Sequence, residues 1–154
     1  MSRRFACAIT LAVLAPVTAS AGPYTDDLSK CLVASTTVDD RLSLARWMFL
    51  SFAAHPSVAG IVTTKPADVD KANAEFGVLF MKLLTDSCRE KTKAALSYEG
   101  PIAIQLSFQV LGQVAGMELA RSPEVQARMS GVSKQIDAGK IKALVDETGA
   151  KAAN

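Results

Sequence analysis

Apolar side chains recur every three or four residues along nearly the whole chain, which is the spacing of one face of an α-helix. The clearest stripe starts near Pro66 and comprises Val69, Ala72, Phe76, Leu79, Phe80, Leu83 and Leu84. No segment alternates apolar and polar residues over enough positions to predict a sheet. The pattern therefore predicts an all-α protein.

Prolines, glycines and short polar residues mark the ends of the predicted helices. We expect helices over residues 24–34, from the Thr36 and Thr37 caps to His55, from Pro66 to Ser97 with a bend near Asp86, from Pro101 to Ala120, from Ser122 to Ile136, and a last short helix that ends at Gly149. Asp39 and Asp40 follow the two threonines at the spacing of a capping box. Residues 57–66 are expected to form a loop after His55-Pro56, because the residue before a proline disfavours helical backbone angles.

Residues 1–21 have the three parts of a secretory signal peptide. Arg3 and Arg4 supply the positive start, residues 5–15 are mostly apolar, and Ala19-Ser20-Ala21 supplies the small residues of a cleavage site. We expect cleavage to leave residues 22–154 as one domain, which is long enough to bury a core. We expect this domain to be a single compact bundle of five to seven helices, located in the periplasm or secreted.

Export decides the expected state of the cysteines. Cys7 would leave with the signal peptide, so that Cys31 and Cys88 remain. In an oxidising compartment such a pair is expected to form a disulfide. The bridge would close a loop of roughly 58 residues, which the chain-entropy model values at about 4 kcal/mol. Both cysteines lie on apolar helix faces, so that two buried free thiols are the alternative.

The charge of the chain gives no support to nucleic-acid or membrane binding. The formal net charge is +2, and loss of Arg3 and Arg4 would leave a neutral chain without the basic surface that nucleic acid requires. The same balance leaves no Lys and Arg cluster for an anionic membrane. The longest apolar run after residue 21, residues 44–54, is interrupted by Arg46 and Ser51. We therefore expect no integral membrane segment in the mature chain.

Motifs for catalysis, metal or cofactor binding are not found in the sequence. The chain has one histidine, His55, which we place at the C-terminus of a helix, where the helix dipole stabilises its charged form. Asp68 and Asp70 have a two-carboxylate spacing but belong to the first turn of a predicted helix, where acidic residues are common. No Cys-x-x-Cys pair and no glycine-rich phosphate loop occurs. We expect no cofactor, no metal and no enzyme; a hydrolase that uses His55 is the remote alternative.

The predicted helix over residues 101–120 contains a candidate interaction face. Gln105, Gln109 and Gln113 recur every four residues, and Gly112 and Gly116 give a small-x-x-x-small step beside them. Such glycines let a second backbone approach closely, and the glutamines would line one side with amide groups. The face is predicted to bind a partner or a second copy. A solvent-exposed stripe beside an ordinary helix crossing is the alternative.

Four aromatic residues could line an apolar pocket. They are Trp47, Phe52, Phe76 and Phe108. Aromatic residues at helical spacing in a pocket would bind a small apolar ligand. The alternative is that they are ordinary core residues.

One set of residues also resembles a protein family. The residues are Cys31, Leu32, Ser35, Thr36, Asp39, Leu44, Trp47, Phe49, His55-Pro56 and Tyr98-Glu99-Gly100-Pro101. In these positions the chain resembles a family of small exported proteins of Gram-negative bacteria. The resemblance implies a periplasmic location and brings no active site with it.

The function that we expect is protein–protein interaction, by an inhibitor, an immunity factor or an assembly accessory. A carrier of a small apolar ligand is the second hypothesis, based on the aromatic pocket.

Overall fold

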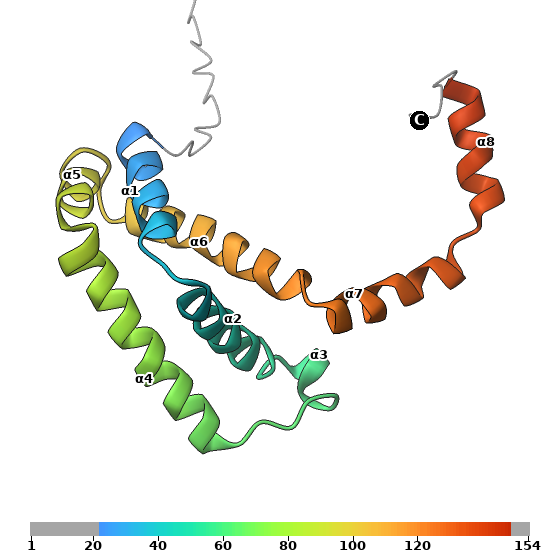
Figure 1. Ribbon diagram of the computed structural model, residues 1–154, viewed down its shortest axis with the longest axis horizontal. Helices are drawn as coiled ribbons and strands as arrows, with labels where there is room; N and C mark the ends of the chain where they lie inside the picture. Colours follow the sequence, from blue (N-terminus) through green and yellow to red (C-terminus); the bar gives the residue numbers. More distant parts are fainter. Residues whose placement is uncertain (1–21, 149–154) are drawn as a thin grey trace, which may run out of the picture.

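The computed structural model describes residues 22–148, which form helices joined by short turns and contain no strand (Figure 1). The α-helices are α1 (Pro23–Ala34), α2 (Val38–Phe52), α3 (Pro56–Ala59), α4 (Pro66–Lys82), α5 (Arg89–Glu99), α6 (Ile102–Ala120), α7 (Pro123–Met129) and α8 (Ala138–Thr148). A π-helical turn (Leu83–Ser87) joins α4 to α5, and a 3-10 helix (Ser130–Gln135) follows α7. The predicted all-α fold is confirmed. The predicted signal peptide, residues 1–21, and residues 149–154 lie outside the described range.

Helix α6 is the centre of the bundle and packs against α1, α2 and α5, while α4 packs against α2. The buried face of α6 has a residue every four positions: Ala103, Ser107, Leu111 and Ala115, all fully buried. Three of the four are small, so that α1 and α2 can approach the α6 backbone. The rest of the core cluster is mostly aliphatic and comprises Leu28, Leu32, Leu44, Ala45, Leu79, Leu83, Leu84, Cys88 and Ala95.

The capping box predicted at the start of α2 is confirmed, whereas the segment after α2 is not the expected loop throughout. The Thr37 hydroxyl accepts from the Asp40 backbone, and the Asp40 carboxylate accepts from Thr37, which completes a capping box. The expected loop 57–66 begins inside a short helix, α3. His55 lies at the N-cap of α3, where its Nδ1 accepts from the Ser57 backbone at 3.2 Å. His55 therefore caps the start of a helix and not, as expected, the end of the preceding one.

The expected bend near Asp86 is a π-helical turn that positions Cys88. The Cys88 backbone donates to the carbonyl of Leu83 at 2.8 Å, five residues earlier, which widens the helix by one residue. Cys88 is 2% exposed and forms a disulfide with Cys31 on α1, with 5.9 Å between their Cα atoms. The predicted disulfide is confirmed, and it fixes α1 to the junction of α4 and α5.

Glu99 provides a second link between α1 and α5. No side chain of its own caps the start of α1; instead the Glu99 carboxylate accepts from the Tyr24 and Thr25 backbones, both at 2.9 Å, and from the Thr25 hydroxyl. Tyr24 and Tyr98 stack beside this contact, with ring centroids 4.4 Å apart. A Cβ at Gly22 would overlap the Glu99 carboxylate in its present position, so a larger residue there would displace this side chain. The hydrogen bond from Thr25, then those from the backbone, lower the pKa of Glu99.

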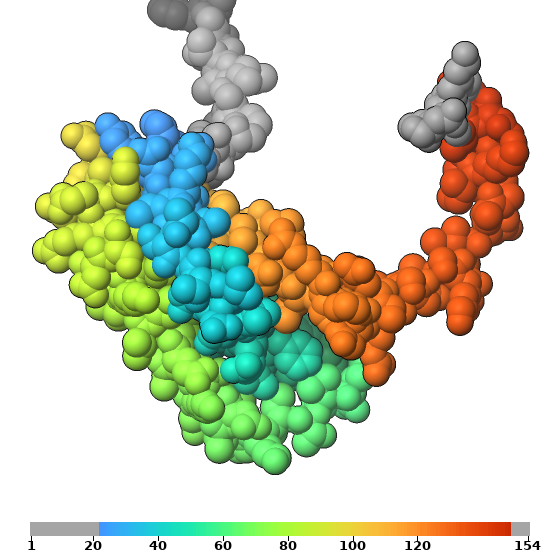
Figure 2. Space-filling view, viewed as in Figure 1, coloured from blue at the N-terminus to red at the C-terminus, as the bar shows by residue number. Residues whose placement is uncertain are grey.

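Residues 123–148, which we call the C-terminal arm, extend away from the bundle (Figure 1). Figure 2 shows the arm leaving the end of α6 with open space on both sides. Among its residues only Val125 is partly buried, and the others are exposed. The bundle is therefore built from α1 to α6, with α7 and α8 outside it.

The disulfide gives a first prediction. Reduction, or the double variant Cys31→Ser/Cys88→Ser, should lower the free energy of unfolding by about 4 kcal/mol because the unfolded chain regains the entropy of the open loop. This loss corresponds to a fall of roughly 15 °C in the melting temperature for a domain of this size. Thermal unfolding followed by circular dichroism measures the shift. An unchanged melting temperature would contradict a stabilising bridge.

The Glu99 contact gives a pH-dependent prediction. Because the pKa of Glu99 is lowered in the folded protein, its contribution to stability is complete near neutral pH and is lost as the pH falls below about 5. The Glu99→Gln variant should therefore melt at a lower temperature than the unmodified protein at pH 7, and the difference should shrink in acid. Glu90→Gln is the matched control, since Glu90 is an exposed carboxylate of α5 paired with Lys93. A Glu99→Gln difference that is constant from pH 7 to pH 3 would contradict the assignment.

Candidate functional site

The C-terminal arm has an apolar stripe that is exposed to solvent. Its members recur at helical spacing within each part of the arm, and all but Val125 are exposed; they are Val125, Met129, Val132, Ile136, Ile141, Leu144 and Val145. Met129, Val132 and Leu144 are each more than half exposed. Single exposed apolar residues are ordinary, whereas seven apolar residues without a covering layer in one 26-residue segment indicate an interaction site. The arm is therefore the strongest candidate surface in the described part of the chain.

Capping side chains mark the first residues of both helices of the arm. Ser122 is the N-cap of α7, with its hydroxyl accepting from the Val125 backbone, and Pro123 occupies the first turn. The Ser122 hydroxyl also donates to the carboxylate of Glu124 and lowers the pKa of Glu124. Asp137 starts α8 by accepting from the Gly139 and Lys140 backbones at 3.0 and 3.1 Å. Both helices of the arm thus begin at caps formed by neighbouring residues of the chain.

The predicted glutamine face is exposed, but its glycines do not have the expected role. Gln105, Gln109 and Gln113 are all exposed on α6. A Cβ at Gly112 would make ordinary contact with the Met48 side chain, and a Cβ at Gly116 would meet open space. No second backbone approaches either glycine. The close approach to α6 occurs at its alanine and serine positions instead.

An open groove lies next to the glutamine face, between α1 and α6. It has a volume of about 460 Å³ and is lined mostly by small and branched apolar side chains; the lining residues are Asp26, Ser29, Lys30, Val33, Ala34, Val110 and Val114. Val110 and Val114 directly follow Gln109 and Gln113 on α6. Amide groups thus lie beside an apolar floor, which makes this groove the second candidate surface.

The predicted aromatic pocket is not assembled. Trp47 stacks on Phe76 with ring centroids 4.1 Å apart, and Phe76 meets Phe108 edge to face at 6.3 Å. Phe80, which is not one of the four predicted pocket residues, packs on Phe108 with ring centroids 4.6 Å apart. Phe52 lies on the last turn of α2, is 65% exposed and is not part of this cluster. The rings pack on one another as core, and the Trp47 indole donates to Asn73 at 3.0 Å.

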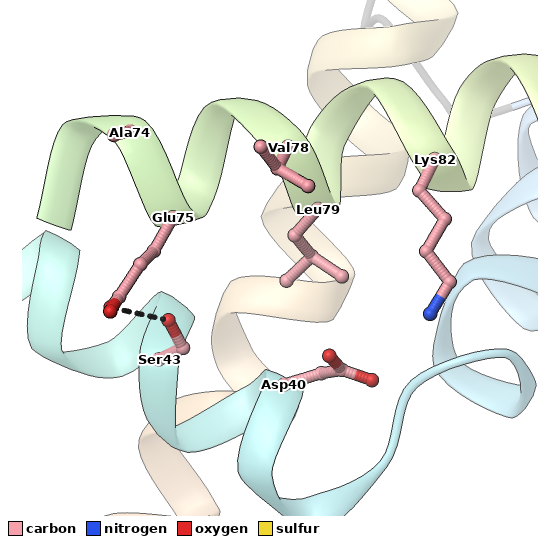
Figure 3. A pocket seen from close by; sticks show the side chains of 7 residues that line it. All are labelled: Asp40, Ser43, Ala74, Glu75, Val78, Leu79 and Lys82. Atoms are coloured by element: carbon pink, nitrogen blue, oxygen red, sulfur yellow. Dashed lines mark hydrogen bonds between the residues drawn. The ribbon is translucent and has the colours of Figure 1, made fainter. Parts of the chain in front are cut away.

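Another open groove of about 460 Å³ lies between α2 and α4 (Figure 3). Three charged side chains line it: Figure 3 shows Glu75 beside Ser43 at one end, and Asp40 and Lys82 toward the other end. The Ser43 hydroxyl donates to Glu75 at 3.5 Å. The pKa of Asp40 is lowered, first by the hydrogen bond from the Thr37 backbone. Because Asp40 is held ionised by the helix cap, it is not poised to exchange a proton near neutral pH.

The residues considered for catalysis or metal binding lie apart from these surfaces or have structural contacts. His55 is exposed and caps α3. Asp68 lies in the first turn of α4. Among the described residues, no group of three or more His, Cys, Asp or Glu side chains could hold a metal ion. None of the described helices has the length and hydrophobicity of a membrane-spanning segment.

Comparison with protein-family models, curated proteins and solved structures found no match to this chain. The resemblance to small exported proteins of Gram-negative bacteria therefore stays a prediction.

The aromatic cluster gives a prediction that separates core from pocket. Phe76→Ala should lower the free energy of unfolding by about 3 kcal/mol, because Phe76 contacts three other rings and truncation leaves a cavity. Phe52→Ala should change it by less than about 0.5 kcal/mol, since Phe52 is exposed. Urea unfolding measures both. Equal losses in the two variants would contradict the separation of Phe52 from the cluster.

Proposed function

We propose that this chain is an exported protein that acts by binding another protein, and that the C-terminal arm provides the contact surface. The exposed apolar stripe of the arm is the observation that carries the proposal. Its exposed side chains would each contribute on the order of 1.5–3 kcal/mol if a partner buried them fully. An inhibitor, an immunity factor and an assembly accessory are all proteins of this type.

The size of the arm supports this role. A stable protein interface uses about 20–30 residues on each side, and residues 123–148 provide a segment of that length in continuous sequence. Helix-in-groove recognition uses apolar residues at positions i, i+3, i+4 and i+7 of one helix. The apolar residues of α7 and α8 follow this spacing, so the arm suits a partner with an apolar groove.

The location is part of the same proposal. The predicted signal peptide directs the chain to the periplasm or beyond it. A disulfide between Cys31 and Cys88 is compatible with such a compartment.

Capture experiments with matched variants test the proposal. The chain from residue 22 onward is immobilised, and proteins retained from a periplasmic extract of its own host are quantified by mass spectrometry. The Met129→Glu/Val132→Glu variant should retain at least tenfold less of the specific partner protein than the unmodified chain, because the substitutions place charges on the apolar stripe. Val78→Glu is the control, since Val78 is 72% exposed on α4, outside the arm.

A second variant tests the other surface. Gln109→Arg/Gln113→Arg charges the glutamine face without touching the arm. Retention lost in the arm variant alone supports the proposal. Retention lost only with the glutamine variant would contradict the assignment of the arm, and retention that no variant changes would contradict both surfaces. Native mass spectrometry of the same preparation would reveal a small apolar ligand if the carrier hypothesis were correct.

A further inference from the structure

The charges of α8 are arranged against its own helix dipole. Lys140 and Lys142 lie near the positive N-terminal end, and Asp146 and Glu147 lie near the negative C-terminal end. Each of these placements is unfavourable by a few tenths of a kcal/mol up to about 1 kcal/mol in an isolated helix. Asp137 at the N-cap is the only acidic group near the helix start. An exposed helix of 11 residues is also near the lower limit of stability in water.

The same charges are ordered around the helix. With 3.6 residues per turn, Ile141, Leu144 and Val145 share one face. Lys142 and Asp146 lie on one side of this face and form an ion pair within the helix, with 2.6 Å between Nζ and Oδ2; in the pair of helices proposed below, these two groups would exchange partners. Lys140 and Glu147 lie along the opposite flank. Each flank thus has a base toward the helix start and an acid toward the helix end.

This order favours one way of pairing two copies of α8. In an antiparallel pair of identical helices with their apolar faces in contact, each flank of one helix lies beside the same flank of the other. The two flanks run in opposite directions along the pair. Lys142 of one copy then meets Asp146 of the other, and Lys140 meets Glu147. In a parallel pair the opposite flanks would meet at the same height, which brings lysine to lysine and acid to acid. Antiparallel pairing also sets the two helix dipoles against each other in the favourable sense.

We propose that α8 of one chain pairs antiparallel with α8 of a second copy, around a two-fold axis near Leu144. This inference rests on the proposed function, in which the arm is a binding surface, and it names a second copy as one partner. The contact is isologous, as in most homodimers. The charges of residues 123–148 balance between Lys and Arg on one side and Asp and Glu on the other, so the arms of two copies do not repel each other.

The size of the paired surface sets the strength of the association. One short helix from each chain covers less than the roughly 800 Å² per partner of a standard interface. The dimer is therefore weak and depends on protein concentration in the micromolar to millimolar range. The apolar residues of α7 and the 3-10 helix lie outside the paired region and stay available to another protein.

Charge exchange tests the inference by sedimentation velocity on the disulfide-bonded chain from residue 22 onward. Lys140→Glu/Lys142→Glu makes α8 acidic throughout, and Asp146→Lys/Glu147→Lys makes it basic throughout. For each variant alone, the dissociation constant of the dimer should be at least tenfold higher than for the unmodified protein, because like charges meet along both flanks. An equimolar mixture of the two should form a heterodimer at least as tightly as the unmodified protein forms its homodimer. Val78→Glu, on α4, is the control and should leave the dimer unchanged.

Helix content must be checked in the same samples. Both charge variants agree better with the helix dipole than the natural sequence does, but both lose the Lys142–Asp146 ion pair; the two effects are of similar size, so circular dichroism should show about the same helix content as the unmodified protein. A monomeric unmodified protein at millimolar concentration, or a mixture of variants that does not associate, would overturn the inference. Either result would leave the proposed function standing if the arm variant Met129→Glu/Val132→Glu still loses its captured protein. If the dimer persists in both charge variants but is lost with Met129→Glu/Val132→Glu, the copies associate through α7, and the α8 pairing is wrong.

Discussion

The bundle depends on the close packing of α1 and α2 against the buried stripe of α6. Ala103, Ser107 and Ala115 are small enough for the neighbouring backbones to come near, and Ser107 donates to the Thr25 carbonyl of α1 at 3.1 Å. With α1 seated there, two further links hold it to α5 and its preceding turn. One is covalent, through Cys88, and the other is the carboxylate of Glu99 at the first turn of α1. The Ser107 hydrogen bond, the disulfide and the Glu99 carboxylate together define the position of α1.

The position of the arm follows from how α6 ends. Ser122 has extended backbone angles ahead of Pro123, so the helix of α6 cannot continue into α7. On the other side of this break the chain has amphipathic helices without a covering layer. A bundle held by its own core and an arm with an exposed apolar stripe together make a protein that presents a binding segment on a stable support.

Local features of this fold were predictable from the sequence because local physics decides them. The capping box of Thr37 and Asp40 and the interruption near Asp86 each depend on a few neighbouring residues. The bridge between Cys31 and Cys88 joins residues 57 apart, and it was predictable because these are the two cysteines that remain after the predicted signal peptide. The tertiary roles were harder to predict. Gly112 and Gly116 suggested a close helix crossing, yet neither lies near a second backbone. Phe52 had the spacing of a core residue but lies on the last turn of α2, beyond the helices that would cover it.

The arm shows most clearly where the sequence pattern stops being informative. Val125, Met129 and Val132 have the same period as the core residues of α4 or α6, and we expected them inside a compact bundle. Periodicity tells which face of a helix avoids water, but it does not tell whether the same chain or another chain covers that face. The reversed charges of Lys140 and Glu147 relative to the dipole of α8 were readable in the sequence, and they gain meaning only once the structure shows α8 exposed.

Hydrogen exchange followed by mass spectrometry shows whether the arm is uncovered in the free protein, because it compares the bundle and the arm in one sample. In dilute protein the account predicts slow exchange for the amides of α1 and α6 and fast exchange for those of α7 and α8. Raising the protein concentration should slow exchange in α8 while α6 stays unchanged. Slow exchange of α7 and α8 at every dilution would show that the arm is covered by its own bundle, and would contradict the account.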